Sequence, residues 1–214
     1  AVPGDVVVYS DSAIEFIADI HPLIEICLQG SGPMLFQTHD HLNIAWTKRD
    51  CLIGMDCDTP RFHRTQQLMG GLQIYRRCET SSEFVQSWLS YCFQEHLLTD
   101  SPNTCGLPNY PEFVEHRHDQ SVLSLLAEKW RLPIYRDPSQ WGNRWALPEF
   151  RPPGTSPIES SLVTGSVTAL YDNSPYGQLI NHHRCRKGPE RRRILPAIRA
   201  IQSFRYLDWR RKAA

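Results

Sequence analysis

Three short polar segments carry side chains that could bind a metal ion or move a proton. Asp11 follows a β-branched run, and His118 and Asp119 lie in the densest polar run of the chain, residues 116–120. His183 follows a second histidine and precedes a basic segment. Mg²⁺ and Mn²⁺ prefer carboxylate oxygens, while imidazole serves as a metal ligand or as a general acid and base. These residue types fit metal-assisted chemistry on a substrate that carries phosphate.

Each of these residues also has a structural interpretation, which the sequence leaves open. Asp11 fits the start of a turn, where aspartate hydrogen-bonds to nearby backbone. Asp119 precedes an apolar helical stripe, so it could be an N-cap rather than a catalytic group. On an extended segment His182 and His183 would point in opposite directions, so only one could complete a given metal site. The mixed-charge run 47–50 could engage a phosphate, although such runs are common on plain surface.

Hydrophobic periodicity predicts the elements that position these residues. A helix over residues 81–96 follows a capping-box pattern at Thr80 and Glu83, and Asp119 begins a second helix whose apolar stripe ends at Trp130. A third helical pattern covers residues 189–212 and is interrupted near Pro196. Short apolar or alternating runs predict strands at residues 6–9, 33–37, 71–76 and 129–135. Strands that alternate with helices indicate an α/β fold.

The length of 214 residues fits one domain, over residues 1–214. Residues 136–178 are rich in Pro, Gly, Ser, Asp and Asn and predict a long irregular loop over the surface. The segment 184–214 holds eleven Lys or Arg against two acids, although the whole chain has a net charge of zero. Such a basic segment favours peripheral contact with an anionic membrane face, while a solvated basic helix is the plainer interpretation. No nucleic-acid partner is expected.

Composition and missing motifs narrow the class of protein. Seven cysteines without a CxxC pair indicate free thiols in a reducing compartment, so we expect a cytoplasmic location. No apolar run reaches the roughly 20 residues of a membrane-spanning helix. The sequence also lacks the GxGxxG, Walker, HExxH and GxSxG motifs. Paired carboxylates for glycoside hydrolysis cannot be recognised by spacing, so hydrolase chemistry stays open.

Six segments together resemble the bacterial-type polysaccharide glycosyltransferases of the GT-A fold, which use nucleotide-diphospho-sugars. The most specific of them is His116-Arg117-His118-Asp119-Gln120-Ser121. The resemblance covers roughly residues 4–130, with residues 182–184 as a final match. In order along the chain, the matching segments are residues 4–13, 46–50, 67–71, 98–102, 109–113 and 116–121.

The resemblance implies a mixed sheet flanked by helices, a Mn²⁺ or Mg²⁺ ion, and a nucleotide-diphospho-sugar donor whose sugar passes to a saccharide or lipid-linked acceptor in surface polysaccharide synthesis. Asp11 would bind the metal and the donor diphosphate, with His183, or failing that His182, as the late metal ligand. Asp119 would be the catalytic base or a donor-sugar contact. The remaining implied site residues are Gln120 and His118 in the catalytic pocket and Lys48, Arg49, Gly70 and Gly71 at the donor.

The sequence departs from this family in two respects. Ala13 stands where a stricter DxD motif has its second Asp, and almost nothing precedes the strand that ends at Asp11, so we expect the N-terminal nucleotide-binding strands to be lacking. Both departures favour an alternative, a non-catalytic sugar-binding or scaffold relative. A further alternative is an unrelated metal-dependent hydrolase that uses Asp11, His118 and His183.

Overall fold

The structure is a computed structural model, and it describes residues 5–142 and 171–183. Residues 1–182 cluster as one compact unit and residues 183–214 as a second, of which only His183 is described. The predicted helix at 189–212 and the basic segment 184–214 therefore lie outside the described residues, and the single domain over 1–214 stays a prediction. In the described part of the chain, no helix is long and apolar enough to cross a membrane.

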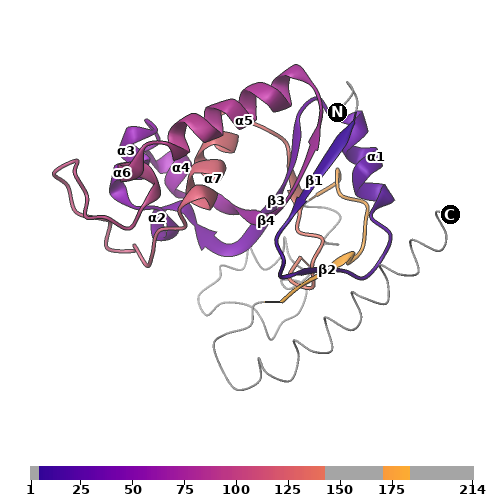
Figure 1. The fold of residues 1–214 in the computed structure, drawn as a ribbon. Helices are drawn as coiled ribbons and strands as arrows, with labels where there is room; N and C mark the ends of the chain where they lie inside the picture. Colours follow the sequence, from indigo (N-terminus) through magenta and orange to yellow (C-terminus); the bar gives the residue numbers. More distant parts are fainter. Residues whose placement is uncertain (1–4, 143–170, 184–214) are drawn as a thin grey trace. The chain divides into compact units, whose positions relative to one another are not determined.

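A four-stranded sheet forms the centre of the first unit (Figure 1). Its order is β1-β4-β3-β5; β4 runs antiparallel to β1 and β3, whereas β5 runs parallel to β3. A separate two-stranded sheet pairs β2 with β6. The strands are β1 (Val6–Ser10), β2 (Ile14–Phe16), β3 (Pro33–Leu42), β4 (Gln66–Arg76), β5 (Ile134–Arg136) and β6 (Ile180–His182). The mixed sheet and its flanking helices confirm the predicted α/β class at this coarse level.

Helices cover both faces of the sheet, because side chains of the inner strands alternate between two cores (Figure 1). On one face Met34 and Phe36 pack with α1, and on the other Leu35 packs against α3, α5 and α7. The helices are α1 (His21–Gln29), α2 (Asn43–Trp46), α3 (Arg49–Gly54), α4 (Pro60–His63), α5 (Glu79–Cys92), α6 (Glu95–Leu98) and α7 (Asp119–Lys129).

Several element boundaries differ from the prediction. The helix predicted over 81–96 divides into α5 and α6, and α5 begins after an extended Cys78 without a side-chain cap, so the predicted capping box is wrong. Here Ser82 Oγ donates to the Cys78 carbonyl instead. The strand predicted at 129–135 is only β5, because α7 continues through Lys129. Conversely, β3 and β4 are longer than predicted. Register shifts in their pairing break the alternation of apolar residues by which the sequence would show the full strands.

The described ends of the predicted 136–178 loop are packed into the protein. Arg136 N–H donates to Ser174 Oγ at 3.0 Å, and Leu179 N–H donates to the Pro138 carbonyl at 2.8 Å. Arg136, Asp137 and Ser174 are all buried. These three residues of the predicted surface loop are therefore packed into the protein. The six cysteines among the described residues are free thiols, as expected; Cys185 lies outside this part.

Candidate functional site

A polar cavity of about 590 Å³ brings together residues from distant parts of the chain. Seven of the predicted site residues line it: Asp11, Lys48, Gly70, Gly71, His118, Asp119 and Gln120. The cavity is completed by Tyr9, Asp100, Ser101, Pro102, Asn103, Asn109, Phe113, Glu115, His116 and Arg117. The predicted set is therefore close together in the fold, apart from Arg49 and His183, which do not line this cavity.

Asp11 lies at the end of β1, directly against the neighbouring strand β4. Its N–H donates to the Gly71 carbonyl at 2.8 Å, and a methyl group placed on Gly71 would lie 2.8 Å from Asp11 Oδ2. The phenol of Tyr9 donates to Asp11 Oδ1 at 2.9 Å. This hydrogen bond and the Asp11 charge raise the pKa of Tyr9, with smaller contributions from burial and Asp119. Tyr9 and Gly71 together set the direction of the Asp11 carboxylate.

Gln120, on α7, packs against the same strand β4 at Gly70, one residue before Gly71. Its side-chain amide donates to Gln67 Oε1 at 3.1 Å, and a methyl group on Gly70 would lie 3.3 Å from Gln120 Cβ. The buried Gln67 in turn donates to the Trp46 carbonyl at 2.8 Å and to Ser121 Oγ at 3.0 Å. The two glycines thus let the Asp11 turn and the first turn of α7 approach β4 closely.

His118, rather than Asp119, occupies the N-cap position of α7, so the cap predicted for Asp119 is wrong. Asp119 is the first helical residue, and its carbonyl accepts a hydrogen bond from Trp88 Nε1 at 3.0 Å. His118 has φ 52° and ψ −124°, a conformation that is costly for a residue with a side chain. Its imidazole Nδ1 lies 2.9 Å from the Leu98 carbonyl, and Nε2 lies 3.6 Å from Asp100 Oδ2. The side chain of Asp119 is therefore not required for capping.

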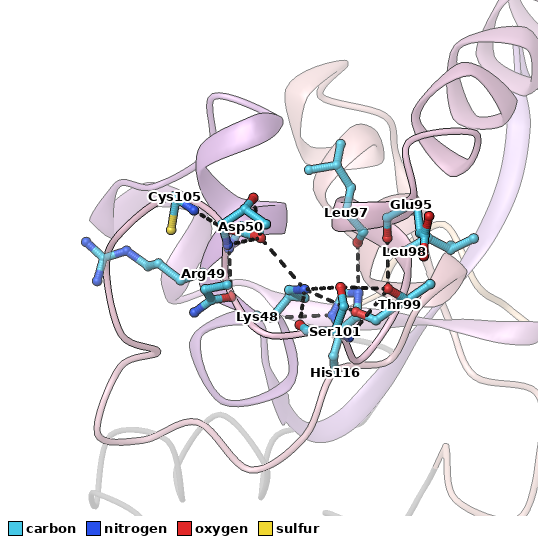
Figure 2. Close-up of polar contacts among 12 residues, drawn as sticks. Lys48, Arg49, Asp50, Glu95, Leu97, Leu98, Thr99, Ser101, Cys105 and His116 are labelled. Atoms are coloured by element: carbon cyan, nitrogen blue, oxygen red, sulfur yellow. Dashed lines mark hydrogen bonds and ion pairs between the residues drawn. The ribbon is translucent and has the colours of Figure 1, made fainter.

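Lys48 lines the cavity but is almost completely buried, with 2% of its surface exposed. Its ammonium donates to the Ser101 carbonyl at 2.7 Å and to the Thr99 carbonyl at 3.2 Å, as Figure 2 shows. Asp50 Oδ2 lies 3.8 Å from the same nitrogen. The ammonium is therefore held by the protein's own oxygens, which limits what it can offer to a phosphate.

Arg49 points to a different cluster, consistent with its absence from the cavity wall. Its guanidinium lies 4.0 Å above the ring of Tyr110, and its Nε donates to Asp58 Oδ2 at 2.9 Å. Tyr110 and His63 also contact Asp58, at 2.7 and 2.9 Å. These contacts give Arg49 a structural environment on α3, apart from the Asp11 end of the cavity.

Sequence reasoning did not single out Asp50 and His116, which hold the cavity walls. Burial by itself would raise the pKa of Asp50, but hydrogen bonds from Cys105 and Thr104 outweigh it and lower that pKa to about 2. Burial lowers the pKa of His116 to about 4, so the ring is neutral at pH 7. Its Nε2 lies 2.9 Å from the Leu97 carbonyl, and Nδ1 accepts the Lys48 N–H at 3.3 Å. Only these long-range contacts distinguish His116 from its neighbours, and no local pattern predicts them.

The two predicted metal ligands, Asp11 and His183, belong to different units of the structure. Strand β2 begins three residues after Asp11 and pairs with β6, in which His182 lies opposite Ile14. The strand that precedes His183 therefore returns to the segment that follows Asp11, while His183 itself belongs to the second unit. Among residues 5–142 and 171–183, no group of three or more His, Cys, Asp or Glu side chains is arranged to hold a metal ion. The Mn²⁺ or Mg²⁺ ion stays a prediction.

Three comparisons with known proteins found nothing similar to this chain. A scan of protein-family models, a search of curated proteins and a search of solved structures each returned no match. The cavity wall combines the carboxylates of Asp11, Asp100 and Asp119 with the imidazole of His118 and the amide of Gln120. Such groups accept and donate hydrogen bonds to hydroxyls, and carboxylates also accept a proton or a hard cation. This chemistry suits a ligand rich in hydroxyls.

Proposed function

We propose that the chain is a nucleotide-sugar-dependent glycosyltransferase with a GT-A-like fold. It would move a sugar from a nucleotide-diphosphate donor to a saccharide or lipid-linked acceptor in surface polysaccharide synthesis. One observation carries the proposal: residues of four separate segments, chosen for that chemistry by their resemblance, line a single polar cavity. Convergence of residues 11, 48, 70–71 and 118–120 in space is what a common substrate site requires.

In the proposed reaction, the acceptor hydroxyl attacks the anomeric carbon while the bond from that carbon to the diphosphate oxygen breaks. Asp119 accepts the hydroxyl proton, and the nucleoside diphosphate leaves with the bonding electrons. His118 and Gln120 orient the sugar and the acceptor. Catalysis of this kind depends mainly on holding the attacking oxygen and the anomeric carbon in line and close together.

The donor end of the proposed site is Asp11. Divalent cations of this type are held by one or two carboxylates, water and substrate phosphates, so the single exposed carboxylate of Asp11 fits such an ion. When bound, Mn²⁺ or Mg²⁺ would stabilise the charge that develops on the leaving diphosphate. Lys48 would add positive charge from its buried position in the cavity wall. A cytoplasmic location, with membrane contact through residues 184–214, belongs to the same proposal.

The test is thermal unfolding of the wild type with Mn²⁺ and a panel of nucleoside diphosphates, each alone and together. A ligand that binds only the folded state at about 100 times its Kd stabilises it by about 2.7 kcal/mol, or roughly 5–10 °C for a chain of this size. We expect a shift that needs both components and that disappears in Asp11→Asn. The matched control, Asp172→Asn, removes an exposed carboxylate outside the cavity and should keep the shift.

Transfer itself is checked by release of the nucleoside diphosphate from a donor that produces a shift, with and without a saccharide acceptor. Acceptor-dependent release that Asp119→Asn abolishes would support the catalytic role of that carboxylate. If no nucleotide shifts the melting temperature with Mn²⁺ present, or if Asp11→Asn responds like the wild type, the donor site is not at Asp11. A non-catalytic sugar-binding relative would then be the better proposal.

A further inference from the structure

Three side chains hold the backbone of residues 97–101 along one wall of the cavity. Each contact is to a backbone carbonyl, and Figure 2 shows those made by Lys48 and His116. The carbonyls and their partners are Leu97 with His116 Nε2 at 2.9 Å, Leu98 with His118 Nδ1 at 2.9 Å, Thr99 with Lys48 Nζ at 3.2 Å, and Ser101 with Lys48 Nζ at 2.7 Å. A loop whose successive carbonyls are bonded in this way is fixed in position.

Asp100 lies within this fixed segment, yet its side chain takes no part in holding it. The carboxylate lines the cavity and is 71% exposed. Within the described part of the chain, its polar neighbour is His118 Nε2 at 3.6 Å, which is too long for a hydrogen bond. The surrounding contacts therefore present the Asp100 carboxylate to the cavity with its hydrogen-bonding capacity unused.

The imidazole of His118 is oriented toward the same place. A carbonyl oxygen can only accept, so the 2.9 Å contact between His118 Nδ1 and the Leu98 carbonyl requires the ring proton on Nδ1. In the neutral ring Nε2 then carries the lone pair, and it is this atom that faces Asp100. The positive φ of His118 shows that its backbone is held in a costly conformation, which persists only where the surroundings fix it.

We propose that Asp100 and His118 bind neighbouring hydroxyls of a sugar ring. The two carboxylate oxygens accept from two hydroxyls, and His118 Nε2 accepts from a third. The inference rests on the proposed function, for which it names the group that recognises sugar rather than nucleotide. Asp11 and Asp100 then divide the cavity, because the first addresses the diphosphate and the second the saccharide.

The sugar could belong to the acceptor or to the donor, and two binding arms distinguish these sources. In the first arm, methyl glycosides of the common hexoses are titrated without nucleotide, and binding is followed by ligand-observed NMR. In the second, calorimetry compares a nucleoside diphosphate with the corresponding nucleotide-sugar in the presence of Mn²⁺. Asp100→Asn keeps the shape of the side chain but removes its charge, so we expect binding to weaken on the order of 10-fold in the arm that contains the recognised sugar.

Two variants make the result specific. Asp11→Asn should retain glycoside binding, and Glu95→Gln, which neutralises an exposed side chain of α6 outside the cavity, should leave both arms unchanged. Loss of nucleotide binding alone would count against the proposed transferase while the sugar site stands. The inference is overturned if Asp100→Asn binds glycosides and nucleotide-sugars as tightly as the wild type, or if no sugar binds the wild type in either arm.

Discussion

The buried carboxylate of Asp50 provides a quantitative test of the structure around the cavity. It is 2% exposed and accepts hydrogen bonds from Thr104 N at 2.7 Å, Thr104 Oγ1 at 3.0 Å and Cys105 N at 2.8 Å. These bonds hold the segment that leads from Asn103 to Asn109, and both of those residues line the cavity. An asparagine at position 50 would turn its NH₂ group toward at least one of these donors, because only one of its two terminal atoms can accept.

The expected loss follows from the pKa of Asp50. A fall from 3.8 in a free side chain to about 2 in the folded protein corresponds to roughly 2 kcal/mol of stability at neutral pH. Removing one member of a buried ion pair costs about 3–5 kcal/mol, but Lys48 keeps its two carbonyl partners. We therefore expect Asp50→Asn to lower the free energy of unfolding by about 2–3 kcal/mol at pH 7.

The sign of the pH dependence makes this prediction refutable. A folded-state pKa below the unfolded value stabilises the protein above about pH 4, and that stability is lost as the pH falls through about 2. Urea unfolding of the wild type and Asp50→Asn from pH 7 to pH 2 should thus show a difference that shrinks toward the acid end. Asp172→Asn, an exposed control, should match the wild type throughout. A difference that is below 0.5 kcal/mol at pH 7, or that does not change with pH, would refute the reasoning.

Three further predictions concern the cavity wall. Gly71→Ala should push the Asp11 carboxylate aside and weaken the shift in melting temperature given by Mn²⁺ and nucleotide. In the control Gly177→Ala the new methyl group meets nothing within 4 Å, so the shift should stay unchanged. The melting temperature of His118→Gly should exceed that of His118→Ala by roughly 2–4 °C. Both variants lose the ring, but only glycine adopts the positive φ without strain. The net gain in stability is about 1 kcal/mol once the greater entropy of glycine in the unfolded chain is subtracted. Between pH 6.5 and 4 the wild type should lose stability on the order of 3 kcal/mol, because His116 takes up a proton in the unfolded state but not in the folded state. His116→Gln should not show this loss. An equal slope in urea unfolding of the wild type and this variant would contradict the burial of a neutral ring.

The sequence predicts β1 and α7 because their local patterns and their burial agree, whereas the helices α1 to α4 were not predicted. The run at 6–9 is β1, and the apolar stripe after Asp119 is α7, since one face of each packs against a core. Boundaries fail where a distant contact competes with the local signal. Residues 38–41 are polar and look like a loop, yet they continue β3; Thr38 Oγ1 donates to the Gln67 carbonyl at 2.7 Å across the pair.

The site is predictable by residue type but not by role. The run at 116–120 is dense in polar groups, which indicates a site, but it does not separate a buried neutral His116 from a half-exposed His118 two residues later. Their difference comes from burial, which lowers the pKa of His116, whereas both rings contact carbonyls of α6 about 20 residues earlier in the chain. Lys48 is similar, because its charge suggests a phosphate ligand until the fold brings the carbonyls of residues 99 and 101 against it.

The distribution of charge in the cavity bears on whether a diphosphate could bind without a metal ion. Asp11, Asp100 and Asp119 all line it with exposed side chains, whereas Lys48 is buried against backbone carbonyls. Arg117 also lines it, but its Nε lies 3.0 Å from Glu115. Among residues 5–142 and 171–183, the cavity would therefore offer a diphosphate several carboxylates and no cation that is both exposed and unengaged by an acid or carbonyl. Like charges at such distances repel. A divalent cation between Asp11 and the diphosphate would reverse this repulsion, so any nucleotide binding here should depend on the metal far more steeply than on either basic side chain.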